Sequence, residues 1–197
     1  MPMGELDRAA RFNQVFDSYL SDITAYCSWR CCDREDAEDS VADVFLVAWR
    51  RLSDIPEGGA ARVWLYATAR RVTANRVRSR RRQARLLERV AAASRIEQSP
   101  PEDPLADVVR DVLRRLKPRD QEVLYLAEWE GLSSGEIATV LRCSAVSARG
   151  RLHRARRRFR QGFETARSRQ RKEQPQDASG LSNLLLSEEP DGSRPLT

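Results

Sequence analysis

Apolar residues recur along this chain with the spacing of amphipathic helices. Intervals of three and four residues place apolar side chains on one face of a helix. Three series follow this spacing: Phe12, Val15, Phe16, Tyr19, Leu20 and Ile23; Val41, Val44, Phe45, Ala48, Trp49 and Leu52; and Leu105, Val108, Val109, Val112, Leu113 and Leu116. No stretch shows sustained strand alternation. We therefore predict an all-α protein.

Helix-breaking residues divide the helical pattern. Proline and glycine interrupt it at 55–59, and prolines interrupt it again at 100–104. We therefore predict two small helical domains joined by a flexible linker, with a polar tail that is expected to be disordered. The expected boundaries are 1–84 for the first domain, 85–104 for the linker, 105–164 for the second domain and 165–197 for the tail.

Composition excludes several classes of protein. No apolar run in the 197 residues approaches the ~20 residues that a membrane span needs. The first residues lack the basic and apolar segments of a secretory signal. We therefore expect a cytoplasmic protein without membrane insertion, and reduced thiols at its four cysteines.

The net charge of +6 is unevenly distributed. Residues 62–89 carry +9 and residues 142–172 carry +11, whereas 1–61, 90–141 and 173–197 are acidic. Arginine supplies 33 of the 35 basic residues. Arginine suits the recognition of phosphate and guanine, but the codon bias of a high-GC genome would explain the excess of arginine equally well. The layout is more informative, because two nearly pure basic blocks indicate two contacts with a polyanion such as nucleic acid.

The second basic block begins in a pattern typical of a helix-turn-helix. Ser133 and Glu136 have the spacing of a capping box, and Ser144 can cap the following basic helix. Val146 and Leu152 are expected to face the core. Arg142 stands in the turn, where glycine is frequent, at some cost in backbone energy. The second helix of such a motif enters the major groove of DNA.

The first basic block forms the end of a three-part pattern. An acidic amphipathic stretch at 36–51 precedes a proline- and glycine-containing loop at 52–61, and a tryptophan-containing basic helix is expected at 62–82. Such a helix is about 30 Å long. It could follow a DNA backbone while its aromatic residues stack on exposed bases.

Together these motifs resemble the extracytoplasmic-function (ECF) sigma factors of the sigma-70 family, over about residues 10–163. The resemblance rests on Asp36-Ala-Glu-Asp39 through Trp49, on Trp64-Leu-Tyr66 through Arg82, and on the helix-turn-helix from Leu132 to Arg158. It implies a non-enzymatic subunit, without cofactor, that binds core RNA polymerase and directs promoter recognition, melting and initiation. It further implies contacts with the clamp of the beta-prime subunit and the beta flap, and an anti-sigma factor as regulator.

The resemblance also implies three groups of binding residues. The polymerase-binding group is Asp36, Asp39, Asp43, Phe45 and Trp49. The group for the minus-ten element is Arg62, Trp64, Tyr66, Arg70, Arg71, Asn75 and Arg78. The group for the minus-thirty-five element is Ser147, Arg149, Gly150, Arg151, His153, Arg154 and Arg156. Two positions depart from the family pattern: Ala42 replaces a frequent glutamine, and Gly150 replaces a usual hydroxyl residue.

Two other functions remain open at this point. A transcription regulator that binds operator DNA alone would explain the helix-turn-helix, but not the acidic helix followed by Trp64-Leu-Tyr66. A redox or metal sensor would use Cys27, Cys31 and Cys32, although no fourth metal ligand lies close to them in sequence. We expect no metal site, and the sequence shows no catalytic motif.

Overall fold

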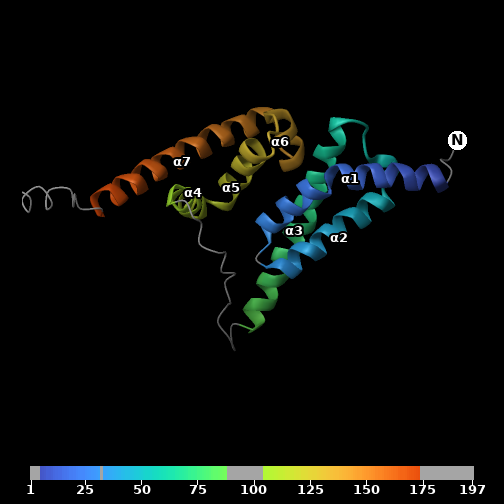
Figure 1. Ribbon diagram of the computed structural model, residues 1–197, viewed down its shortest axis with the longest axis horizontal. Helices are drawn as coiled ribbons and strands as arrows, with labels where there is room; N and C mark the ends of the chain where they lie inside the picture. The colour runs from blue at the N-terminus through green and yellow to red at the C-terminus, as the bar shows by residue number, and fades with distance from the viewer. Residues whose placement is uncertain (1–4, 32, 88–103, 174–197) are drawn as a thin grey trace, which may run out of the picture.

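The computed structural model describes residues 5–31, 33–87 and 104–173, and this part of the chain consists of helices joined by short turns (Figure 1). Its elements are α1 (Glu5–Arg30), α2 (Arg34–Arg50), η1 (Leu52–Asp54), α3 (Gly59–Leu87), α4 (Pro104–Arg115), α5 (Pro118–Leu124), η2 (Tyr125–Trp129), α6 (Ser134–Leu141) and α7 (Ala145–Glu173). The all-α prediction is thus confirmed. None of the described helices has the length and apolarity needed to cross a bilayer.

Helices α1, α2 and α3 form an N-terminal bundle in which each helix packs against the other two. Asp33 is the N-cap residue of α2. Its carboxylate accepts a hydrogen bond from the Asp36 backbone N–H at 2.7 Å. Ile23, Val44 and Leu65, one from each helix, are completely buried. Burial of these apolar faces, rather than helix propensity, is the main source of stability in such a bundle.

Helices α4–α7 form a C-terminal unit around one side of the long helix α7. Helices α4, α5 and α6 all pack against α7. Val123, Leu126, Ile137 and Ala155 are completely buried where these elements meet. The remainder of α7 extends past this core as a single straight ribbon (Figure 1).

Helix α7 corrects the expected start of the polar tail. Residues 165–173 are helical rather than irregular. The reason is local: neither proline nor glycine occurs between Gly162 and Pro175, and arginine, glutamine and glutamate lose little side-chain freedom in a helix. Residues 174–197 and most of the expected linker (88–103) lie outside the described residues.

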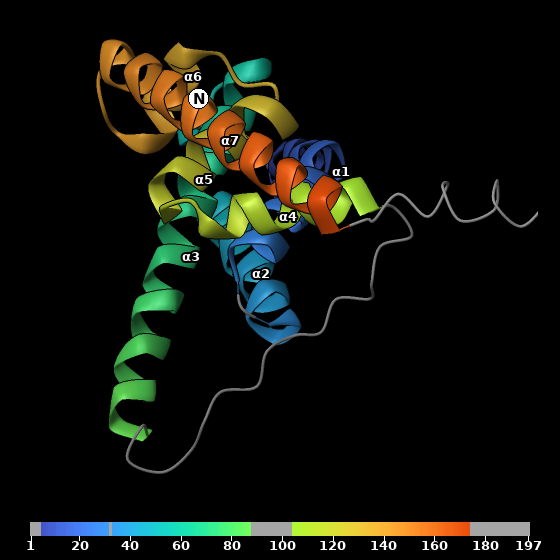
Figure 2. The ribbon, with the colours of Figure 1, turned by 90° about the vertical axis from the view of Figure 1, so that its left-hand side faces the viewer.

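The two units are packed together, a contact that was not part of the prediction of two domains joined by a flexible linker. Helix α6 lies against α3, and most buried apolar residues of both units belong to one contiguous cluster. Figure 2 shows α5 and α6 above the descending C-terminal half of α3. The contact therefore involves the N-terminal half of α3, where the basic block begins.

The α4–α7 crossing depends on the absence of a side chain at Gly162. A Cβ atom there would lie 2.9 Å from Cγ1 of Val112. We expect Gly162→Ala to destabilise the protein by about 1–2 kcal/mol, because overpacking outweighs the gain in helix propensity. Thermal unfolding followed by circular dichroism measures this loss.

Two variants control for this prediction. Val112→Ala in the Gly162→Ala background should recover part of the loss, because it removes the atoms that clash. Gly135→Ala should be neutral or stabilising, since the nearest atom to its Cβ is Ser133 Oγ at 3.9 Å. A Gly162→Ala protein as stable as the parent would contradict the proposed crowding.

Candidate nucleic-acid interface

The helix-turn-helix is built as the sequence predicted. The Ser133 backbone N–H donates to Glu136 Oε2 at 2.8 Å, and the Glu136 N–H donates to Ser133 Oγ at 3.3 Å. The hydrogen bonds to Ser133 also lower the pKa of Glu136. Ser144 starts α7 by accepting the Ser147 N–H at 3.1 Å. Both caps satisfy backbone donors that a helix N-terminus leaves unpaired.

The turn between α6 and α7 adopts a left-handed backbone at Arg142. Its φ of 52° and ψ of 56° lie in the region that residues with a side chain rarely adopt. The next residue, Cys143, donates its N–H to the Ala138 carbonyl at 3.0 Å and closes the end of α6. Arginine is thus accommodated in the turn, as the sequence required.

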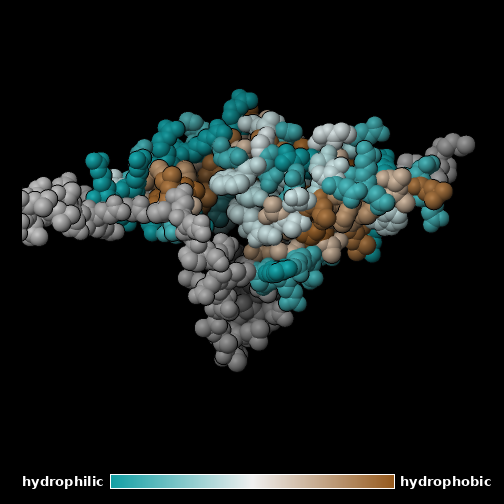
Figure 3. Space-filling view, in the orientation of Figure 1, coloured by the Kyte–Doolittle hydropathy of each residue, from teal (hydrophilic) through white to brown (hydrophobic). Residues whose placement is uncertain are grey.

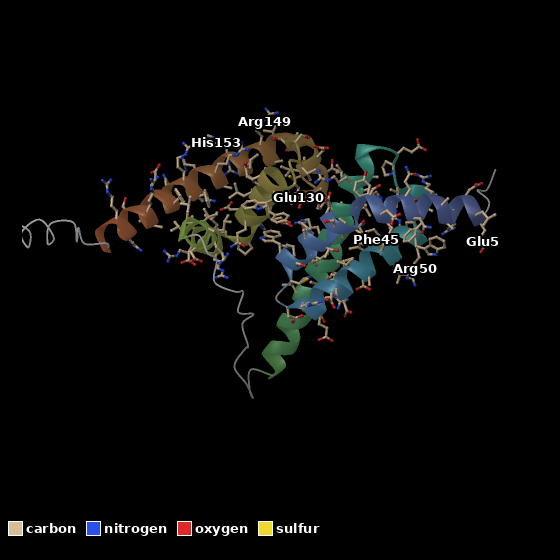
Figure 4. All side chains as sticks on the ribbon, viewed as in Figure 1. Glu5, Phe45, Arg50, Glu130, Arg149 and His153 are labelled. Atoms are coloured by element: carbon tan, nitrogen blue, oxygen red, sulfur yellow. The ribbon has the colours of Figure 1, made fainter. Side chains whose placement is uncertain are left out.

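Helix α7 divides into a buried face and a basic exposed face. Ala148, Leu152 and Ala155 recur at helical spacing and are buried against the unit. Figure 4 shows Arg149 and His153 projecting from the outer side of this helix. The expectation that Val146 faces the core was wrong: its residue surface is 76% exposed, because Ala148 takes the core position in the first turn.

Most of the residues expected to read the minus-thirty-five element lie on this outer surface. Ser147, Arg149, His153, Arg154 and Arg156 are exposed, whereas Gly150 and Arg151 are partly buried. Arg156 Nε donates to Glu128 Oε1 at 2.8 Å. A Cβ at Gly150 would lie 3.3 Å from the Arg154 guanidinium, so the glycine leaves room for this side chain to cross the helix.

The seven residues expected to hold the minus-ten element do not share one surface of α3. Asn75 and Arg78 are exposed and hydrogen-bonded to each other. Trp64 is partly buried, with the Arg51 guanidinium 6.0 Å from its ring centroid. The remaining four, Arg62, Tyr66, Arg70 and Arg71, are partly or fully buried.

Glu130 of the C-terminal unit accounts for the burial of Arg62 and Tyr66. Arg62 donates to the Glu130 carbonyl at 2.8 Å and to Glu130 Oε2 at 2.9 Å, and its Nε lies 3.0 Å from Asp22 Oδ2. The Tyr66 hydroxyl donates to the same Glu130 oxygen. Burial, followed by the bond to Glu130, raises the pKa of Tyr66. In this arrangement Tyr66 is therefore not available to stack on bases.

Glu122 makes a second set of contacts between the units. Its Oε1 accepts from Arg70 Nε at 3.1 Å and from the Tyr26 hydroxyl at 3.2 Å, and it lies 3.7 Å from Arg30 Nη2. Beside it, the rings of Trp29 and Tyr125 stack with centroids 4.3 Å apart. Sequence reasoning missed this interface, although the acidic segment 90–141 next to two basic blocks was a signal for it.

Arg76 of α3 contacts the acidic face of α2. Arg76 lies 2.7 Å from Asp39, 2.6 Å from Asp43 and 3.8 Å from Asp36. The structure brings these three carboxylates together around Arg76, which offsets part of their charge. The partner was not recognised in the sequence because it follows 33 residues after Asp43 in the chain.

The aromatic residues of α2 differ in exposure. Phe45 is a core residue, with 4% of its surface exposed and its ring edge-on to Phe16. This burial contradicts the expected direct contact of Phe45 with polymerase. The 3.6-residue period of α2 places Phe45 on the face that packs against the core (Figure 4). Trp49 and Leu46 are exposed instead. Figure 3 shows hydrophobic surface on the α1–α2 side of the molecule.

Cys27 is poorly placed for redox chemistry. Cys27 is completely buried, and burial together with the neighbouring Cys31 raises its pKa to about 12. The thiolate is the reactive form, so Cys27 is an inert thiol at neutral pH. Cys32 lies outside the described residues. Within the described ranges, no three His, Cys, Asp or Glu side chains form a candidate metal site.

Comparison with known proteins gives the same division of the chain. The family model for Sigma-70 region 2 matches residues 15–83, and that for Sigma-70 region 4 matches residues 106–159. The ECF RNA polymerase sigma factor BldN of Streptomyces coelicolor is 30% identical over 70% of this chain and 53% of its own length. The chain thus spans about half of BldN.

Another relative is matched over most of its length. The RNA polymerase sigma-E factor of Streptomyces antibioticus is 30% identical over 75% of this chain and 83% of that protein. The fold is that of the Bartonella quintana sigma factor RpoE, solved in complex with the anti-sigma factor NepR (TM-score 0.63, 22% identity, 78% of this chain and 96% of that one). With its helix-turn-helix and both matching regions, the chain belongs to the ECF sigma factors of the sigma-70 family, non-catalytic subunits that direct RNA polymerase to promoters.

Proposed function

We propose that this sigma factor reads a promoter with two separate helices while its α1–α2 surface binds core polymerase in the cytoplasm. The observation that carries the proposal is the outward basic face of α7, with Arg149, His153 and Arg154 exposed behind a fully capped helix-turn-helix. A helix presented in this way fits the major groove. The domains assigned to these tasks are residues 1–84 and 105–164.

For the minus-thirty-five element, Arg149 and Arg154 are the proposed base-reading residues. A guanidinium pairs with guanine O6 and N7 through two hydrogen bonds, which is the commonest specific contact in the major groove. Ser147, Arg151 and Arg156 surround them with groups suited to phosphate. Gly150 contributes by leaving the path of Arg154 open.

For the minus-ten element, the proposed surface runs along α3 from Arg62 to Arg78. Trp64 and Tyr66 supply aromatic rings for stacking on melted bases. The arginines supply positive charge that attracts the phosphates of the DNA backbone. The segment 52–61, which includes η1 and the first residues of α3, is proposed to accept a flipped base, whose extrusion costs a few kcal/mol. Asn75 and Arg78 are exposed in the present arrangement, whereas Arg62, Tyr66 and Arg70 require release from Glu130 and Glu122.

For polymerase, the proposed clamp-binding surface is the exposed side of α2. Trp49 is held edge-on by Phe12 at a centroid distance of 5.1 Å and lies under the Arg8 guanidinium. A rigid, exposed tryptophan of this kind is typical of interface hot spots. Asp39 and Asp43 form its acidic border, and the C-terminal unit is proposed to contact the beta flap.

Regulation by an anti-sigma factor is proposed by analogy with RpoE, whose solved structure contains NepR. The alternative function, an operator-binding regulator that works without polymerase, is favoured by no feature of the structure beyond the helix-turn-helix. Both units and their order match the sigma regions, which a free-standing regulator does not require.

Run-off transcription tests the function directly. Core RNA polymerase reconstituted with this protein should initiate at a discrete genomic start site, and core alone should not. Because a sigma factor supplies promoter specificity, the transcript should depend on two separated DNA elements. Tight operator binding by the protein alone, with no transcript from genomic templates, would instead support the regulator.

Base reading by Arg154 is tested with Arg154→Ala in the holoenzyme. A bidentate contact with guanine should cost about 1–3 kcal/mol of promoter affinity and relax specificity at one base position. Arg167→Ala removes the same charge from an exposed position farther along α7 and serves as the control. A uniform loss across all promoter sequences would mean that Arg154 contacts only phosphate.

The clamp surface is tested with Trp49→Ala. Removing an exposed aromatic anchor should weaken binding to core polymerase by about 2 kcal/mol, or roughly 30-fold in Kd. Val146→Ala, at an exposed apolar position of the other unit, is the control. Fluorescence anisotropy with labelled sigma factor gives both constants, and an unchanged Kd for Trp49→Ala would exclude this surface.

A further inference from the structure

Helix α7 continues beyond the helix-turn-helix, and its basic surface continues with it. The match to Sigma-70 region 4 ends at residue 159, whereas α7 ends fourteen residues later, at Glu173. We propose that residues 160–171 form a second DNA contact, which binds the phosphate backbone beside the minus-thirty-five element. The proposal rests on the proposed function, because it takes the first turns of α7 as the base-reading segment.

Exposed basic side chains form one narrow stripe along α7. Successive residues of an α-helix are about 100° apart, and six basic residues of α7 fall within about 60° of its circumference. Glu164, at the edge of this stripe, is the only acidic residue in the sequence between Ala145 and Lys172. Figure 4 shows the start of the stripe, and Figure 3 shows hydrophilic surface along the upper edge where α7 runs. The basic stripe consists of Arg149, His153, Arg156, Arg160, Arg167 and Arg171, all of them exposed.

Packing against α4 fixes the direction in which α7 leaves the unit. The rings of Phe159 and Phe163 stack with centroids 6.0 Å apart. Gly162 lies against Val112 of α4, on the side of α7 roughly opposite the basic stripe. Figure 1 shows the whole of α7 as one straight ribbon. Residues 160–171 therefore continue the axis of the base-reading segment and present the same basic face.

Most of the charge on the basic stripe is not compensated within the unit. Arg156 pairs with Glu128 at 2.8 Å, and no other ion pair with the stripe occurs among the side chains that the structure describes. Arg167 and Arg171 are four residues apart, which places two like charges side by side and slightly destabilises a helix. A bound polyanion would relieve this repulsion.

The length of the stripe fits a contact that extends past the edge of the major groove. At 1.5 Å per residue, Arg160 lies about 17 Å along the helix from Arg149, and Arg171 lies about 33 Å from it. The major groove is about 12 Å wide. With Arg149 at the base edges, the later arginines therefore reach the phosphates that border the groove. The C-terminal end of the reading helix contacts the backbone in the same way in homeodomains.

A contact of this kind adds affinity without adding base preference. Phosphate contacts position a protein on the duplex but carry no sequence information directly. Arg167→Ala therefore remains a suitable control for base reading by Arg154. Duplex DNA is favoured over an acidic protein segment as the occupant, because the stripe is continuous with the base-reading residues of the same helix.

The test replaces the three arginines of residues 160–171 in the full-length protein. Fluorescence anisotropy with a fluorescein-labelled duplex of mixed sequence gives Kd over about 50–200 mM salt, the range in which phosphate contacts are lost. The glutamine variant combines Arg160→Gln, Arg167→Gln and Arg171→Gln, and the lysine variant combines Arg160→Lys, Arg167→Lys and Arg171→Lys. The control removes equal charge from exposed positions on α4 and on the other side of α7, by Arg114→Gln, Arg115→Gln and Arg169→Gln.

The glutamine variant should reduce the dependence of log K on log salt by about 0.9 for each lost phosphate contact, or nearly 3 in total. The affinity advantage of the parent should therefore shrink about 40-fold between 50 and 200 mM salt. The lysine variant and the control should keep the parental slope, because an ammonium group also binds phosphate. Glutamine has nearly the helix propensity of arginine, and circular dichroism should show unchanged helix content.

A glutamine variant with the parental salt slope would overturn the second DNA contact. An equal fall in the control would do the same, because any loss of charge from the unit would then suffice. A lysine variant that behaves like the glutamine variant would exclude a simple phosphate contact.

Run-off transcription separates these outcomes from failure of the proposed function. Holoenzyme with the glutamine variant should initiate at the parental start site, since phosphate contacts do not select bases. A shifted start site would contradict the assignment to phosphate. Absence of initiation by the parent would defeat the sigma function itself, whereas normal initiation with an unchanged salt slope in the glutamine variant would defeat only the contact by residues 160–171.

Discussion

Charge compensation at Glu122 and Glu130 is the constraint that joins the two units of this protein. Both residues are almost fully buried, with 4% and 7% of their surfaces exposed. An ionised carboxylate removed from water requires charged or hydrogen-bonding partners, and breaking a buried pair leaves an uncompensated charge. Here the partners come from α1 and α3 of the other unit. The arrangement of the two sigma regions therefore depends on the positions of the arginine side chains that pair with these carboxylates.

Helix α3 is the element most affected by these contacts, because it contributes both to the hydrophobic core and to the surface between the units. Leu65, Ala69 and Thr73 recur every fourth residue and are completely buried within the molecule. Shifted by one position, Arg62, Tyr66 and Arg70 face the C-terminal unit, while Arg76 binds the acidic side of α2. A single helix thus meets a hydrophobic core, a second domain and an acidic neighbour on different faces, and the residues proposed for DNA are shared among these contacts.

Local features could be predicted from the sequence because their causes lie within a few residues. The Ser133–Glu136 capping box, the Ser144 cap and the strained turn at Arg142 all occur where the pattern indicated. Helical periodicity likewise identified Val44, Val112 and Leu152 as buried. Where prediction failed locally, as at Val146, two apolar positions competed for one place in the core and the smaller Ala148 occupied it.

By itself, the sequence determined the all-helical class, the helix-turn-helix and the resemblance to a sigma factor, since each follows from periodicity, caps and motif order. Only the tertiary structure decided that Tyr66 and Phe45 are buried, that Arg76 holds Asp39 and Asp43, and that Arg62 and Arg70 contact carboxylates 52 to 68 residues away in the chain. Charge blocks record how much charge a segment carries. The partner of each charge is set by the packing of helices distant in sequence, where burial makes an unpaired charge too costly.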